Sequence, residues 1–442
     1  MISRYKLYYT TFLIVFWTMS CWGFVVEELL HFLAPLSAPV QLLCDMVLLV
    51  LGLLTIRQRG DLVVLGSYIV LAFVSTVIVN GESLGTLFNG SRDFYGLIFI
   101  VPILRWFFTC DHDREFRNSF NRQLYYWLII QAVCITFQFI KYGANDHGGG
   151  SMGMGASGLM SMSIYLISFY LVTQSWDSSR YLHSLMENKR YILLLYPSFL
   201  NETKVSFFLL AAYFLLLVKF DRAFLIKTLY IVPLSIVGFI AVGNIYLSVT
   251  GQDADELLSY DYAKEYFYGE DLDFMVDAAL MIQDGTMDVD PRDWWTVDIP
   301  RFAKPVLMTP ILRDETDGGT MLGAGVGHFK GGRVFALTSF AKRNSWLLQG
   351  SRPWSFFIYT QLGIIGLIWA IAVVCRDIFV RGSSRPFSWQ IQTLIALALF
   401  LVLFYNDSLR IFNFCTIVFY MTLSLKYYTP DDSAAQEETN ET

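Results

Sequence analysis

Apolar residues in this chain gather in runs of roughly 15 to 20, and a helix of that length can cross the core of a bilayer. Short polar segments separate the runs. Hydrophobic residues make up 55% of the 442 positions and charged residues only 16%, whereas soluble domains carry about 25% charged residues. The mean hydropathy is +0.47. The pattern therefore predicts an all-α polytopic membrane protein.

The apolar runs predict about 12 transmembrane helices. They begin near Tyr8, Val40, Leu62, Phe94, Leu124, Leu159, Tyr191, Val205, Leu229, Phe356, Ile391 and Ile411. The first run lacks a following small-residue cleavage site, so we interpret it as a retained span. The seventh and eighth runs are short and are separated only by the sequence NETK, so a single broken span is the alternative there.

The distribution of Lys and Arg indicates the orientation, because cytoplasmic loops carry an excess of both. With both termini in the cytoplasm, cytoplasmic segments hold about 18 of the 32 basic residues, and the short outer loops hold four. Merging the two short spans would break this alternation, which favours the count of 12.

One outer segment is much longer than a plain connector. We therefore divide the chain into a bundle of about nine spans over residues 1–250, a loop domain over 251–355, three transmembrane helices over 356–426 and a disordered cytoplasmic tail over 427–442. The loop domain holds 17 acidic and five basic residues up to Asp317, and then five basic residues and no acid up to Ser355.

A glycine-rich stretch, LGAGVGHFKGGR, occupies Leu322 to Arg333. A nucleotide-binding P-loop would need Gly-Lys-Ser/Thr at the start of a helix, but two further glycines follow Lys330. The stretch also lies on the predicted outer side, where no ATP is available. Both arguments exclude a nucleotide-binding loop.

Three motifs follow one another along the chain at characteristic positions. NETKVSFF opens the eighth predicted span, LGAGVG lies near the end of the long loop, and LGIIGL, Leu362 to Leu367, lies in the tenth span. Their order resembles the O-antigen polymerase/O-antigen ligase superfamily of bacterial cell envelopes, over about residues 201–371. The sequence departs from the family pattern with Lys204 where many members have Arg, and with Arg352 and Gln361 near where many ligases have His and Glu.

The resemblance implies a glycosyltransferase of the bacterial inner membrane that needs neither metal nor cofactor, with a periplasmic loop domain. A polymerase would transfer the growing glycan from undecaprenyl diphosphate to a lipid-linked repeat unit, and a ligase would transfer it to lipid A-core. The implied partners are these lipid-linked substrates, membrane lipids and a chain-length regulator protein, but no nucleic acid. A lipid-linked oligosaccharide flippase is the rival class, although no half-to-half repeat typical of transporters is visible.

Basic residues on the predicted outer side are the candidates for binding a lipid diphosphate. Guanidinium groups match phosphate oxygens in pairs, and preorganised cations stabilise the charge of a leaving group. The candidates are Arg92, Lys204, Arg333, Arg352 and Arg410. Ion pairs with a neighbouring acid are the alternative for several of them, with Asp93, Glu202 and Asp407 as the partners of Arg92, Lys204 and Arg410.

His328 is the candidate catalytic base, because histidine can accept the proton of an acceptor hydroxyl near neutral pH. A turn or packing role is the alternative, and any of the loop acids could replace it as the base. Asp45 lies inside the second predicted span, where we expect it to pair within the bundle. The loop from Gly143 to Gly158 is predicted to be a mobile lid or a linker.

Overall fold

The computed structural model describes residues 4–110, 114–143, 148–153, 155–200, 205–218, 299, 301–329, 337–348, 352–380, 383 and 385–428. Every regular element in this part of the chain is helical, which confirms the predicted all-α class. Six helical stretches are long and apolar enough to cross a membrane, and three shorter apolar helices accompany them. The count of 12 spans stays a prediction, since the ninth, from Leu229, lies outside the described residues.

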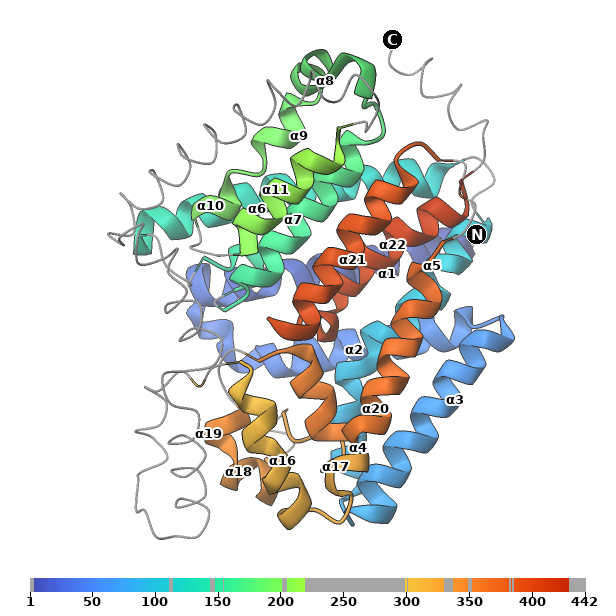
Figure 1. The fold of residues 1–442 in the computed structure, drawn as a ribbon, viewed down its shortest axis with the longest axis vertical. Coiled ribbons are helices and arrows are strands. Elements are labelled where there is room, and N and C mark those ends of the chain that lie inside the picture. The colour runs from blue at the N-terminus through green and yellow to red at the C-terminus, as the bar shows by residue number, and fades with distance from the viewer. Residues whose placement is uncertain are drawn as a thin grey trace.

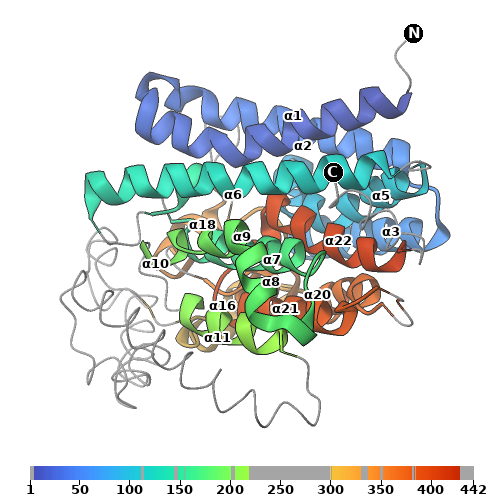
Figure 2. The same cartoon turned by 90° about the horizontal axis from the view of Figure 1, so that it is seen from above.

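Five of the six long stretches come from the first third of the chain (Figure 1). Their elements are α1 (Arg4–Phe24), η1 (Val25–Leu29), η2 (His31–Leu36), α2 (Ser37–Thr55), α3 (Arg59–Phe73), η3 (Val74–Val79), α4 (Leu84–Ser91), η4 (Arg92–Phe94), α5 (Tyr95–Cys110) and α6 (Glu115–Tyr142). α1 and α2 lie side by side on one outer face of the bundle, with α6 next to them (Figure 2).

The run predicted to form a seventh span from Tyr191 is not one continuous helix. After η5 (Gly150–Met152), α7 (Ser157–Val172) and η6 (Ser178–Arg180), the chain forms only short pieces: α8 (Tyr181–Glu187), α9 (Lys189–Leu193) and α10 (Pro197–Leu200). Pro197 explains the break between the last two, because proline lacks the N–H of the helical ladder and disfavours helix at the preceding residue. The eighth predicted span corresponds to α11 (Val205–Leu216).

The rest of the described chain adds a group of small helices and three longer ones. They are α16 (Ala303–Glu315), α17 (Gly319–Leu322), α18 (Ser339–Arg343), α19 (Ser345–Leu348), α20 (Trp354–Ile378), α21 (Ser388–Phe404), η8 (Ser408–Arg410) and α22 (Phe412–Lys426). The small helices α16 to α19 lie together at one end of α20 (Figure 1). They share a separate apolar core that includes Leu307, Met308 and Phe340.

The bundle has helices buried on all sides and helices with an exposed apolar face. Nearly every residue of α5, α7 and α22 is buried, as expected of helices that are apolar all round. The outer helices instead expose large apolar side chains, including Leu43 at 65%, Val63 at 68% and Ile368 at 64%. Soluble proteins rarely expose wide apolar patches, so these faces fit contact with lipid.

One end of the bundle is closed by an ion-pair network that we call the closed cluster: Asp61, Arg105, Arg376 and Asp377. Arg105 donates to both carboxylate oxygens of Asp61, at 2.5 and 2.6 Å, and to Asp377 at 3.1 Å. Arg376 pairs with the same two carboxylates. The network joins α3, α5 and α20 at the end of the bundle that the charge distribution assigns to the cytoplasm.

Candidate functional site

The glycine-rich stretch docks onto a break in α20. Gly363 has φ 63° and ψ −161°, so it interrupts the helix. The carbonyl groups of Thr360 and Gln361, which an unbroken helix would use internally, accept hydrogen bonds at 2.9 Å from the backbone N–H groups of Ala324 and Gly325. The LGAGVG and LGIIGL motifs, more than 30 residues apart in the sequence, therefore meet at this break.

Glycine is required here because backbones approach one another too closely for a side chain. A Cβ added at Gly363 would lie 2.2 Å from the carbonyl oxygen of Met321, and one at Gly325 would lie 2.9 Å from the Cα of Thr76. Both glycines also have positive φ, which other residues rarely adopt. Gly325 and Gly363 thus have a structural explanation that needs no bound phosphate.

Side chains from η3 and from α20 bind further backbone groups of the stretch. The Thr76 hydroxyl accepts from the N–H of Val326 at 2.9 Å, and the Gln361 side chain accepts from the N–H of Gly327 at 2.9 Å. Ser75 donates to the carbonyl of Leu322 at 2.6 Å. These bonds set the position of the two residues that follow, His328 and Phe329.

The His328 ring is buried and both of its nitrogens have partners. Nε2 lies 2.7 Å from the carbonyl oxygen of Ala324, and Nδ1 lies 2.6 Å from Oγ1 of Thr338. Since a carbonyl only accepts, we infer that Nε2 carries the proton and that Nδ1 accepts from the Thr338 hydroxyl. Burial lowers the pKa of His328, although the bond to Ala324 acts in the opposite direction. The arrangement favours the packing role, and the role as catalytic base stays a prediction.

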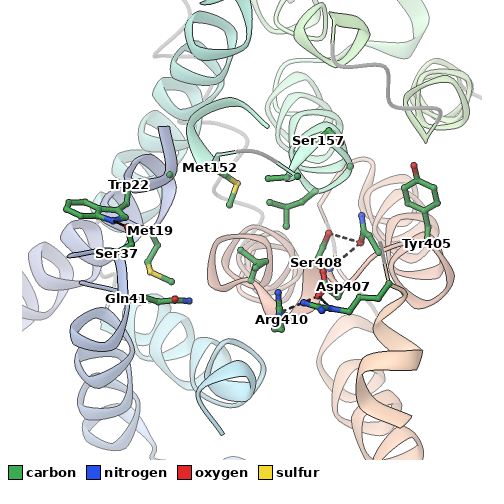
Figure 3. Close-up of a pocket in the computed structure, with 18 of the residues that line it drawn as sticks. Met19, Trp22, Ser37, Gln41, Met152, Ser157, Tyr405, Asp407, Ser408 and Arg410 are labelled. Carbon is green, nitrogen blue, oxygen red and sulfur yellow. Dashed lines mark hydrogen bonds and ion pairs between the residues drawn. The ribbon is translucent and has the colours of Figure 1, made fainter. Parts of the chain in front are cut away.

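A cavity of about 710 Å³ lies at the opposite end of α20 from the closed cluster. Its walls come from the end of α1, the start of α2, the segment before α7, Arg301, Arg352 and the turn between α21 and α22. The charge distribution assigns all six of these segments to the outer side of the membrane. Figure 3 shows Trp22, Met19 and Gln41 on one side of the cavity and the α21–α22 turn on the other.

Three arginines and one carboxylate lie in the cavity wall. Nε of Arg352 donates to Oδ2 of Asp407 at 2.8 Å, and Nε of Arg410 lies 3.2 Å from the same oxygen. We call these three residues the cavity cluster. Arg301, the third arginine, has its guanidinium carbon 4.2 Å from the centre of the Tyr405 ring.

The cavity cluster is partly open, with side chains of Arg352, Asp407 and Arg410 exposed by 16%, 22% and 19%. Burial and the charge of Arg410 lower the pKa of Arg352. Burial also acts to raise the pKa of Asp407, but the two arginines outweigh it and hold that pKa below its usual value. The buried Asp93 adds its negative charge near both arginines. Among the described residues, the three arginines of the cavity wall outnumber the carboxylates of Asp407 and Asp93, and guanidinium groups do not lose a proton in proteins.

Asn406 adds a hydrogen-bond donor to the same wall. Its Oδ1 accepts from the backbone N–H of Ser408 at 3.1 Å and from the Ser408 hydroxyl at 2.7 Å. Its Nδ2 is buried and has no hydrogen-bond partner among the described residues. A buried donor without a partner is costly, so a ligand oxygen in the cavity would satisfy this group.

Arg92 does not line the cavity. It is buried, its Nε donates to Oδ2 of Asp45 at 2.7 Å, and its Nη1 donates to Asn89 at 3.1 Å. The structure thus gives Asp45 the partner within the bundle that the sequence predicts. It also gives Arg92 an ion pair with Asp45, whereas the sequence suggested Asp93 for that role.

The structure brings together two of the five predicted diphosphate-binding residues, Arg352 and Arg410. Lys204 and Arg333 lie outside the described residues. Sequence reasoning missed Arg301 and Asn406 as parts of the cavity. The available signal for Arg301 is its position as one of five basic residues in a segment that holds 17 acids.

The described part of the loop between α6 and α7 is anchored and does not behave as a plain linker. The backbone N–H groups of Gly150 and Ser151 donate to the side chains of Gln138 and Gln131, at 2.8 and 2.9 Å. The Ser151 hydroxyl donates to the carbonyl of Ser20 at 2.6 Å. This segment joins α6 to α1 beside the cavity and places Met152 in the cavity wall.

No protein-family model matches this chain, and no curated protein matches it either.

Proposed function

We propose that the protein is a membrane glycosyltransferase that uses a glycan donor linked to a polyprenyl diphosphate. The observation that carries the proposal is the cavity whose wall, in the part of the chain that the structure describes, holds Arg301, Arg352 and Arg410 and the carboxylate of Asp407. An excess of arginine in a partly buried pocket fits an anion with several oxygens, and a diphosphate is such an anion. The order of the three sequence motifs supports the same reading.

In the proposed reaction, a hydroxyl oxygen of the acceptor glycan attacks the anomeric carbon of the donor. The bond from that carbon to the diphosphate oxygen breaks, and undecaprenyl diphosphate leaves with the electron pair. The acceptor proton passes to a base, for which His328 is the candidate. Arg352 and Arg410 would stabilise the charge that develops on the leaving diphosphate, which is the role of preorganised cations in such reactions.

We propose a polysaccharide polymerase, in which the acceptor is a second lipid-linked repeat unit on the outer face of the bacterial inner membrane. Transfer to lipid A-core by a ligase and transport of lipid-linked oligosaccharide by a flippase are the alternatives. The position of the cavity among the segments assigned to the outer side supports an outer-face reaction.

The test is to incubate the purified full-length protein in detergent with lipid-linked repeat units and to separate the glycans by length. Longer glycans support a polymerase. Transfer that occurs only when lipid A-core is added supports the ligase. No reaction in detergent, together with movement of the lipid across sealed bilayers, would contradict the proposed chemistry and support the flippase.

A further inference from the structure

The two arginines of the cavity cluster lie over two phenylalanine rings that pack against each other. The guanidinium carbon of Arg352 is 4.9 Å from the centre of the Phe329 ring, and that of Arg410 is 5.5 Å from the centre of the Phe357 ring. The two ring centres are 5.0 Å apart, with an angle of 47° between the planes. We call this pair of rings the aromatic platform.

The platform joins two distant parts of the chain. Phe357 belongs to the first part of α20, before the break at Gly363. Phe329 lies within the glycine-rich stretch, four residues after Gly325, and the backbone bonds from Ala324 and Gly325 to Thr360 and Gln361 hold the stretch against that same break. The docking of the stretch therefore determines where the Phe329 ring lies beneath Arg352.

A ring face holds a guanidinium group without using its N–H donors. The attraction acts on the flat face of the cation and is strongest where water is excluded, which leaves the edge of the group for oxygen ligands. Arg352 uses one such donor for Asp407 and another for the carbonyl of Leu348, at 2.8 Å each. Long side chains lose rotamer freedom when they are ordered, so a fixed ring removes part of that cost before a ligand binds.

We propose that the Phe329–Phe357 platform positions Arg352 and Arg410 for a diphosphate group. The docking of the glycine-rich stretch on α20 fixes the position of Phe329 in this platform. Phe329 is thus a positioning residue that acts through Arg352. The nature of the ligand rests on the proposed function, whereas the platform itself rests on the ring and guanidinium distances. The break in α20 holds the glycine-rich stretch, the stretch positions Phe329, and Phe329 supports Arg352 in the cavity wall.

The experiment measures binding of inorganic pyrophosphate to the purified full-length protein in lipid nanodiscs. Phe329→Leu removes the ring face and should weaken binding about tenfold, the size of a desolvated cation–ring contact. Phe329→Tyr keeps the ring and should bind like the wild type. Phe340→Leu is the matched control, because Phe340 belongs to the loop core against which Phe329 also packs, but its ring lies against the His328 ring, 4.9 Å between centres, and not beneath Arg352 or Arg410. It should change binding by less than about twofold.

A double-mutant comparison separates positioning from general loosening of the fold. In an Arg352→Gln background, where Arg301 and Arg410 retain residual binding, Phe329→Leu should have an effect of about twofold or less. Equal losses in Phe329→Leu and Phe340→Leu, or an undiminished effect in the Arg352→Gln background, would overturn the platform. If Phe329→Leu does not fold, Phe329→Met gives the same comparison, because its flexible side chain fills space without a ring.

The outcomes also separate this inference from the proposed function. Tight pyrophosphate binding that Phe329→Leu leaves unchanged would overturn the platform alone. Absence of pyrophosphate binding by the wild type would overturn both proposals.

Discussion

The closed cluster and the cavity cluster both consist of arginine and aspartate side chains, and they lie at opposite ends of α20. They differ in how the charges are paired and in whether they border a cavity. In the closed cluster, two arginines face two carboxylates; the side chains of Asp61, Arg105 and Asp377 are only 3%, 7% and 5% exposed, and that of Arg376, at the edge of the network, is 33% exposed. In the cavity cluster, two arginines pair with one carboxylate, that of Asp407, with the charge of the buried Asp93 nearby, and they border a cavity that has a third arginine in its wall.

The difference indicates how a structural ion pair can be told from a ligand site in this protein. In the closed cluster each arginine pairs with both carboxylates, so the network holds its helices together. In the cavity cluster two arginines pair with one carboxylate beside open space, which leaves guanidinium donors that an anion can bind. By this criterion the buried pair of Arg92 and Asp45 belongs with the closed cluster, even though sequence alone made Arg92 a candidate for diphosphate binding.

The largest expected effect is on activity at the cavity cluster. Arg352→Gln should lower the rate of glycan extension about 10²–10³-fold, the usual cost of losing one preorganised electrostatic donor. The amount of protein inserted in the membrane should stay near normal, because Asp407 keeps Arg410 as a partner. The measurement is the initial rate of extension of lipid-linked repeat units by equal amounts of purified protein.

Arg313→Gln is the matched control, because Arg313 is 72% exposed and pairs only with its neighbour Asp314 among the described ion pairs. It should leave the rate unchanged. Normal extension by Arg352→Gln would contradict a catalytic contribution of the cavity cluster.

The next effect concerns stability at the closed cluster. Asp61→Asn should destabilise the fold by up to about 3–5 kcal/mol, because it removes one of the two carboxylates that pair with the buried Arg105 and leaves Asp377 as the one carboxylate of the cluster for two arginines. Asp407→Asn should lower the stability of the fold by a smaller amount, because Arg352 and Arg410 border the cavity and are partly exposed. Thermal unfolding in detergent and the yield of folded protein measure both. A larger loss for Asp407→Asn than for Asp61→Asn would reverse the assignment of structural and ligand-binding roles.

A smaller effect depends on pH and arises at His328. Burial lowers its pKa in the folded protein, so the unfolded chain binds a proton first as the pH falls. Stability should therefore be constant above about pH 6.5 and fall below it, by at most about 1.4 kcal/mol for each pH unit until the folded ring is also protonated. Unfolding temperatures at pH 7.5 and 5.5 should differ more for the wild type than for His328→Gln. Equal differences would show that His328 is not held neutral by burial.

The smallest expected effect is that of metal removal. The cavity arginines can provide the positive charge that a divalent ion supplies in other diphosphate sites, so EDTA should leave the rate of glycan extension unchanged. A loss of activity that Mg²⁺ or Mn²⁺ restores would show that the arginines are not sufficient.

The helices could be predicted from the sequence wherever apolar runs are long, as for α1, α5, α6 and α20. The run from Tyr191 is divided into short helices in the structure, with a new helix beginning at Pro197, and apolar content alone does not predict that division. The sequence does not predict the break at Gly363 either, because a glycine inside an apolar run is compatible with an intact helix. The pair LGAGVG and LGIIGL was noticed only as a resemblance, and their contact depends on a fold that brings distant segments together.

The candidate site was predictable only in part, for a similar reason. Arg352 and Arg410 stood out because basic residues are rare in the short segments assigned to the outer side. Their sharing of Asp407 joins segments 55 residues apart, and the pairing of Arg92 with Asp45 joins segments 47 residues apart. Local sequence suggests nearest neighbours as partners, so it named Asp93 for Arg92. The fold brings α2 beside η4, so that Asp45 of α2 lies 2.7 Å from Arg92 of η4.

The most direct test of the central claim is an experimental structure of the full-length protein with undecaprenyl diphosphate bound. We expect the diphosphate in the cavity, with its oxygens within hydrogen-bond distance of Arg352, Arg410 and the free Nδ2 of Asn406, and with the guanidinium groups still over Phe329 and Phe357. A diphosphate bound at another position, with the cavity cluster unchanged and without contact to it, would contradict the account.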